Sequence, residues 1–214
     1  MGFSSQDKLI SEMTTNGKFL RVDWNKNFLP TTAAVAGEWH SLFRGGGNPG
    51  ADAILNTGTN LAFQALTDAT ANATGIQHGG NVSTDTKHIV NASAFTAAAT
   101  TVPNVLMLID LLGFYRKTSV TTTTLQVTDN TITLPRYTDG AGVQAFFVNS
   151  NATALGAGTP NLSIEYTNSA GTTGRTTPTT LPVGKTAAAN GLILYSGTGV
   201  GKYGPFVPLA AGDK

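Results

Sequence analysis

The stretch that most resembles a site for chemistry lies near the carboxyl end, in LILYSGTGVGKYGPF at 192–206. Gly201 and Lys202 match the final Gly-Lys of the phosphate-binding pattern G-x-x-x-x-G-K-[ST]. Ser196 stands where the first glycine belongs, and Tyr203 replaces the Ser or Thr that would bind Mg²⁺. Pro205 disfavours the helix that would have to begin there. We therefore expect a glycine-rich connection between two strands and not a nucleotide site.

Other catalytic and metal-binding patterns are also incomplete. His40, His78 and His88 do not share metal-ligand spacing, and the chain has no cysteine to supply a thiolate. Asp110 interrupts an apolar run, which favours a carboxylate at a strand end or bend over a catalytic acid. No G-x-S-x-G stretch marks a serine hydrolase. We expect a non-enzymatic protein with no catalytic residue, cofactor, metal or small-molecule substrate.

Aromatic and basic residues adjoin one another at 19–26, 114–117 and 134–140. The formal net charge is only +1, which argues against a dedicated nucleic-acid binder and against attraction to a membrane surface. Tyr, Trp and Arg are also the usual anchors of protein interfaces. The candidate subunit-interface residues are Leu9, Ile10, Met13, Trp24, Trp39, Arg136 and Tyr137.

The elements that must position these residues are short. Residues 4–13 predict one helix, with Ser4 and Asp7 as a capping box. The apolar face of this helix must pack against its own chain or against a neighbouring chain. The run VLMLIDLLGFY at 105–115 is the strongest apolar segment and predicts a buried strand, bent at Gly113. Polar residues 67–86 predict a long loop. The other predicted strands are 18–24, 38–43, 60–66, 87–95, 125–134, 142–150, 161–168, 192–196 and 206–209.

Composition favours an all-β fold. Charged residues are only 12% of the chain, about half the usual share, and Thr-rich strands with 25 Gly and 9 Pro suit many turns. We expect one β-sandwich or jelly-roll-like domain over 17–214, preceded by an N-terminal arm with a short helix over 1–16. The apolar stretches are too short to span a bilayer, so we expect a soluble chain or part of an assembly.

Five longer phrases of the chain are GFSSQDKLISEMTTNGKFLRVDWNK, VPNVLMLIDLLGFY, TLPRYTDGAGVQAFFV, IEYTNSAGTTGR and YGPFVPLAAGDK. Taken in order, they resemble virion structural proteins of tailed bacteriophages over most of the chain. The resemblance implies a component of a particle. It supplies no site residue and does not distinguish head from tail.

Resemblance and composition together favour an accessory head protein of the cement or decoration type. Such a protein is made in the cytoplasm of the host bacterium and sits on the capsid surface of the virion. Its expected partners are the major capsid protein and copies of itself in a homo-oligomer such as a trimer. Two alternatives stay open: a tail-tube or baseplate component, and a receptor- or glycan-binding module in which Trp24, Trp39 or Tyr137 forms a sugar platform. An enzyme is the least favoured interpretation.

Overall fold

The computed structural model describes residues 4–16, 19–26, 37–48, 50, 61–66, 87–95, 105–119, 122–129, 133–150, 161–178, 181–182, 191–194 and 204–213. The predicted loop 67–86 and most of the glycine-rich stretch, residues 195–203, lie outside these described residues. His78 lies outside them too.

The chain groups into two compact units. Unit 1 comprises Met1–Asp23 and Ile76–Leu111, and unit 2 comprises Trp24–Gly75 and Leu112–Lys214. The expected boundary between residues 16 and 17 falls within unit 1. The division into an arm over 1–16 and one domain over 17–214 therefore stays a prediction.

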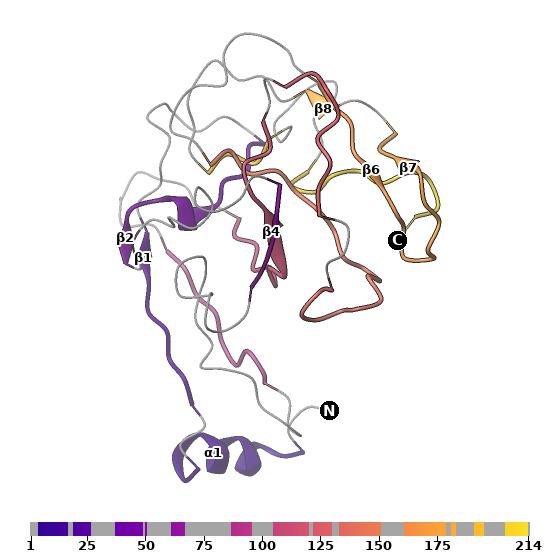
Figure 1. Cartoon of the computed structure of the whole chain (residues 1–214). Coiled ribbons are helices and arrows are strands. Elements are labelled where there is room, and N and C mark those ends of the chain that lie inside the picture. Colours follow the sequence, from indigo (N-terminus) through magenta and orange to yellow (C-terminus); the bar gives the residue numbers. More distant parts are fainter. Residues whose placement is uncertain are drawn as a thin grey trace. The chain divides into compact units, whose positions relative to one another are not determined.

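Unit 1 contains the helix α1 (Gln6–Thr14), which confirms the predicted helix. Its N-cap is Ser5, whose Oγ accepts a hydrogen bond of 3.1 Å from the backbone N–H of Lys8. The predicted capping box of Ser4 and Asp7 is wrong, because the cap lies one residue later and its third residue is Lys8 rather than an acid. Residues 19–24 then continue as extended chain outside any strand ladder (Figure 1).

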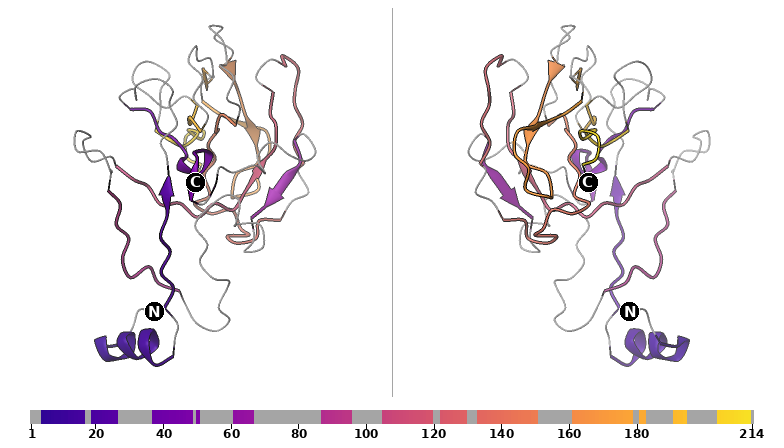
Figure 2. Two further views of the ribbon diagram at one scale, coloured as in Figure 1. Left: turned by 90° about the vertical axis from the view of Figure 1, so that its left-hand side faces the viewer. Right: turned by 90° about the vertical axis from the view of Figure 1, so that its right-hand side faces the viewer.

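The described strands are short, as the arrows in Figure 2 show, and they form four antiparallel pairs. Because no sandwich or barrel is defined among these short pairs, the all-β class stays a prediction. The 3₁₀ turn η1 (Leu42–Arg44) precedes the second strand. The pairs are β1 (Asn25–Lys26) with β2 (Gly47–Asn48), β3 (Phe63–Ala65) with β4 (Gly113–Tyr115), β5 (Asn161–Leu162) with β8 (Leu181–Pro182), and β6 (Glu165–Tyr166) with β7 (Arg175–Thr176).

The buried segment 191–194 organises the core of unit 2. The backbone N–H of Ile193 donates to the carbonyl of Trp39 (2.8 Å), and that of Leu194 donates to the carbonyl of Phe147 (2.9 Å). The segment is thus hydrogen-bonded along both edges, and its three apolar side chains are 4–7% exposed. A continuous apolar run is typical of an extended segment covered on both faces. Of the predicted strand 192–196, the described residues form isolated bridges at Leu192 and Ile193 and no ladder.

The alternating sequence LSIEYT at 162–167 is confirmed as a strand pattern. Leu162, Ile164 and Tyr166 are half-buried, whereas the residue after each of them is exposed. The Ala170-Gly171 pair, which in the sequence indicates a turn, lies in one: the N–H of Gly171 donates to the carbonyl of Asn168 (2.9 Å), and φ at the glycine is 80°. This turn joins β6 to β7 in a hairpin.

The expected buried strand at 105–115 is wrong for most of its length. Only 113–115 forms a strand, and only Leu112 is buried. Residues 105–110 are extended and exposed, because no described segment supplies a neighbouring strand or a covering layer for them. High apolar content did not translate into burial within the single chain.

Several other predicted strands form no ladder in their described residues. The stretch 38–43 gives an isolated bridge from His40 to Leu192 and then enters η1, and 142–150 gives only a bridge from Val148 to Ile193. The remaining cases are 18–24, 87–95, 125–134 and 206–209. The predicted strand 60–66 is confirmed as β3.

The pairing of β3 with β4 predicts a strong effect for Gly113→Ala. A Cβ at residue 113 would lie 2.6 Å from the backbone carbonyl oxygen of Gln64 and would collide with the Phe63 ring. We expect a loss of about 1–3 kcal/mol in the free energy of unfolding, or a fall in Tm of roughly 2–10 °C. Gly50→Ala is the control, since a Cβ there meets nothing within 4 Å. Equal melting temperatures of the two variants in calorimetry would contradict this packing.

Candidate interaction surface

Large apolar side chains are exposed all along the described part of unit 1. Their exposed fractions range from 39% for Val22 to 92% for Phe95. Polar surfaces and isolated apolar residues are normal, but so many exposed large apolar side chains in one small unit are not. We call this set the unit 1 apolar surface; its members are Ile10, Phe19, Leu20, Val22, Ile89, Val90, Phe95, Val105, Leu106, Met107, Leu108 and Ile109.

The helix face predicted from the sequence forms one end of this set. Ile10 is 54% exposed, while Leu9 and Met13 are half-buried. No residue of α1 is fully buried. A nine-residue helix gains most of its stability from packing of its apolar face, so this face requires further cover.

The extended segments of unit 1 also present backbone polar groups. Within the described part of the chain, residues 89–95 and 105–109 make no backbone hydrogen bond. Their N–H and carbonyl groups therefore resemble those of edge strands, which pair readily with another chain. Exposed backbone and exposed apolar side chains occur together on the same residues. That combination is typical of a segment that is completed by strand addition.

The extent of the unit 1 apolar surface matches that of a protein interface. Its members are on average more than half exposed. At about 60–120 Å² for a fully exposed apolar side chain, they present on the order of 600 Å² of apolar area. A standard interface buries about 800 Å² on each partner, of which roughly 60% is apolar.

The two tryptophans predicted as interface anchors are held within unit 2. Trp24 packs against Phe43 with ring centroids 6.4 Å apart and an interplanar angle of 38°. Trp39 is half-buried, and its carbonyl belongs to the hydrogen-bonded edge of segment 191–194. Each indole is thus positioned by the core and exposes only part of its surface.

Arg136 and Tyr137 belong to a closed turn of unit 2. Tyr137 is 58% exposed and has a left-handed backbone, with φ at 53°, and its carbonyl accepts a hydrogen bond of 2.8 Å from Gly140. Arg136 is half-buried and donates from Nη1 to the carbonyl of buried Leu66 (3.4 Å). A backbone held in this conformation costs about 1 kcal/mol or more. The turn therefore presents an exposed aromatic ring on a fixed base.

The residues considered for catalysis or metal binding are dispersed. His40 Nε2 lies 3.6 Å from Glu38 Oε2, and both side chains are 7% exposed. His88 and Asp110 are exposed, so Asp110 is not the buried carboxylate that its apolar neighbours suggested. Among the described residues, no three His, Cys, Asp or Glu side chains gather where they could hold a metal ion.

A polar cluster in unit 2 surrounds the carboxylate of Asp213. Its oxygens accept hydrogen bonds from Tyr166 Oη (2.6 Å), Asn168 Nδ2 (2.8 Å) and Arg175 Nε (3.0 Å). These three donors lower the pKa of Asp213 to about 2, with Tyr166 as the largest cause. In turn, Tyr166 Oη accepts from the N–H of Ala210 (2.8 Å). The cluster fixes the segment 210–213 on the hairpin of β6 and β7.

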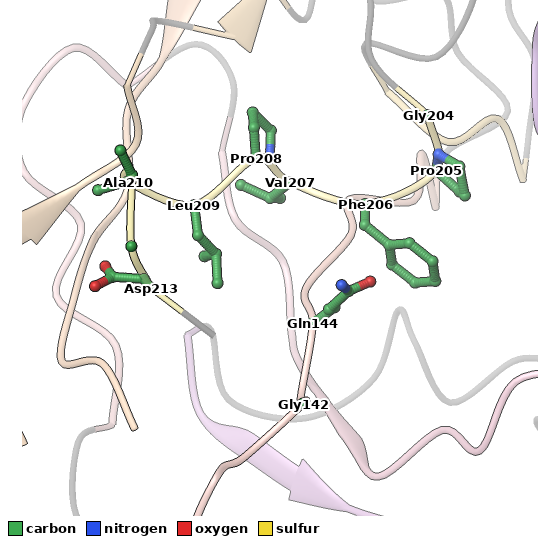
Figure 3. Close-up of a pocket in the computed structure, with 12 residues that line it drawn as sticks. Gly142, Gln144, Gly204, Pro205, Phe206, Val207, Pro208, Leu209, Ala210 and Asp213 are labelled. Atoms are coloured by element: carbon green, nitrogen blue, oxygen red, sulfur yellow. The ribbon is translucent and has the colours of Figure 1, made fainter. Parts of the chain in front are cut away.

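An open groove of about 720 Å³ lies beside this cluster. Figure 3 shows the chain from Gly204 to Asp213 running along it, with Gly142 and Gln144 on the neighbouring segment. Its acidic residue is engaged in structure, because both oxygens of Asp213 accept hydrogen bonds from the protein. Along 205–210 the groove is lined by apolar and proline residues.

Two features of the structure are not predicted by the sequence: the exposure of residues 105–109 and the cluster around Asp213. The apolar run predicts that residues 105–109 are buried, but a run without alternation shows only that both faces need cover and not which chain provides it. The Asp213 cluster joins residues 38–47 positions apart in the sequence, and no local pattern announces such spacing.

The Asp213 cluster predicts a pH dependence of stability. The pKa of this carboxyl is lowered from 3.8 to about 2 on folding, so its stabilising effect is complete above pH 3.8 and is lost as the pH falls towards 2. We expect Asp213→Asn to lower Tm at neutral pH and the difference from wild type to shrink below pH 3.8. Glu165→Gln, at an exposed carboxylate of β6, is the control and leaves Tm unchanged. A constant difference across this pH range in thermal melts would refute the assignment.

None of the described helices has the length and apolar content needed to cross a membrane. Comparisons with protein-family models, curated proteins and solved structures find no match. The functional interpretation therefore rests on the residues themselves, and above all on the unit 1 apolar surface.

Proposed function

We propose that this chain is a non-enzymatic structural protein of a bacteriophage virion, a capsid cement or decoration protein that binds and bridges major capsid subunits. The observation that supports it most is the unit 1 apolar surface. A chain that leaves these side chains uncovered is suited to a place in an assembly, where neighbouring subunits cover them.

The free energy of binding in this proposal comes from apolar burial. About 600 Å² of apolar surface at roughly 25 cal/mol per Å² provides a gross gain on the order of 15 kcal/mol, before the entropy costs of association. Symmetry repeats the contact around the shell, so that modest individual contacts add up through multivalency. Neighbouring capsid subunits are thereby held together against internal pressure.

The composition supports the same role. Only 12% of residues are charged and the formal net charge is +1. Burying a surface of hydroxyl, amide and apolar groups against a neighbour costs less than burying charges. The proposal assigns the partners as the major capsid protein and copies of this chain, without nucleic acid, membrane or substrate. Tyr137 on its fixed turn supplies a further contact for a neighbouring subunit.

Localisation in the virion tests the proposal. We expect cryo-EM of the purified particle to show density for this chain on the outer capsid surface, bridging adjacent capsid subunits. Deleting residues 2–16 removes α1 and should weaken capsid occupancy at least about tenfold, because burial of each large side chain is worth about 1.5–3 kcal/mol. Density confined to the tail would contradict the head assignment and favour the tail-tube or baseplate alternative.

A matched pair of variants separates the apolar surface from general stability. The double variant Ile89→Ser/Phe95→Ser changes two unit 1 side chains that are 70% and 92% exposed. It should bind less well than wild type to capsids that lack this protein. Leu125→Ser with Val127→Ser changes unit 2 side chains that are 84% and 65% exposed, and should bind like wild type. Equal binding of both double variants in a co-sedimentation assay would show that the unit 1 apolar surface does not contribute to capsid binding.

A further inference from the structure

We propose that residues 105–109, VLMLI, pair as an antiparallel strand with the same residues of a second copy across a two-fold axis centred at Met107. This inference rests on the proposed assembly role and names the partner of one segment of the unit 1 apolar surface. It specifies a strand, an orientation and a register.

Backbone geometry supports strand addition at this segment. Residues 105–109 are extended, and within the described part of the chain they make no backbone hydrogen bond. An unpaired extended segment is a template for another strand. Antiparallel pairing of a segment with its own copy places identical groups on both sides of the axis, as a closed two-fold interface requires.

Side-chain exposure shows that both faces of the segment need cover. Exposure does not alternate along it: Val105 is 81% exposed, Leu106 51%, Met107 46%, Leu108 61% and Ile109 41%. A strand at a half-solvated sheet would alternate, whereas a strand within an interface is apolar on both faces. Pairing of two copies places the apolar side chains of the two segments beside one another on each face of the pair.

Charge sets the orientation of the pair. The segment itself carries no charge, and Asp110 follows it directly. In a parallel pair the two Asp110 carboxylates would lie side by side and repel each other. In the antiparallel pair they lie at opposite ends, and the uncharged residues face only one another. The net charge of +1 per chain opposes self-association only weakly.

The register follows from the limits of the exposed run. Centring the axis at Met107 pairs Val105 with Ile109 and Leu106 with Leu108, so every exposed apolar residue faces another. Centring the axis at Leu108 instead would place Asp110 opposite Leu106, and centring it at Leu106 would leave Leu108 and Ile109 without an apolar residue opposite them. The five side chains of the segment present roughly 250 Å² of apolar area per copy, and other members of the unit 1 apolar surface would extend the two-fold contact.

Cysteine crosslinking tests this pairing directly, because the natural chain contains no cysteine. Opposed residues of an antiparallel pair have Cα atoms about 4.5–5.5 Å apart, within the range that a disulfide spans. We expect mildly oxidised Met107→Cys full-length chain to run mostly as a crosslinked dimer. Leu125→Cys, at an 84% exposed site of unit 2, is the control and should crosslink at least about tenfold less.

A second pair of variants tests the register without a disulfide. Leu106→Lys and Leu108→Glu should each be monomeric in sedimentation velocity, since each buries an unpaired charge. An equimolar mixture should recover dimers, because the introduced ammonium and carboxylate face each other across the axis. Wild-type chain that stays monomeric or forms only trimers, or a mixture that recovers no dimer, would overturn the inference.

The same experiments distinguish this inference from the proposed function. A Met107→Cys chain that crosslinks to a capsid subunit and not to its own copy would assign the segment to the capsid and overturn self-pairing. A wild-type monomer that still binds capsids would likewise overturn self-pairing while leaving the capsid role standing. A crosslinked dimer with no affinity for capsids would support self-pairing and count against the cement role.

Discussion

The exposure of the unit 1 apolar surface to water is the physical constraint that dominates this structure. Each of these partly exposed apolar side chains forgoes on the order of 1 kcal/mol relative to full burial, and the extended backbone beside it forgoes hydrogen bonds within the described chain. Exposed apolar surfaces of this extent commonly mark interaction sites. Under the proposed function, the isolated chain is an incomplete unit whose apolar surface is covered on assembly.

Unit 2 contrasts with unit 1 in how its polar and apolar groups are satisfied. Segment 191–194 is buried and hydrogen-bonded along both edges. The carboxylate of Asp213 accepts hydrogen bonds from Tyr166, Asn168 and Arg175 of the β6–β7 hairpin. These internal contacts leave few apolar side chains for a partner. The described exceptions are Leu125, Val127, Tyr137 and Tyr115, and among them the exposed ring of Tyr137 stands on a base that Arg136 holds to Leu66.

Local pattern predicted some elements well and others poorly, for a physical reason. Helix α1, the alternation over 162–167 and the turn at Gly171 depend on neighbours a few residues apart, so the sequence shows them directly. The burial of VLMLIDLLGFY depends on what packs over it, and the sequence of one chain does not reveal that. Asp213 likewise depends on contacts between distant positions. Of the seven predicted interface residues, Ile10 and Tyr137 are well exposed, and the others are partly used within the chain.

Hydrogen–deuterium exchange of residues 87–95 and 105–109 tests the central claim most directly, since it reports on the backbone groups that assembly should cover. The comparison is between the dilute isolated chain and the chain bound in purified particles. This account predicts rapid exchange in the dilute chain and exchange slowed by at least about tenfold in the particle, with residues 204–213 little changed. Equally rapid exchange of both segments in the two states would contradict it.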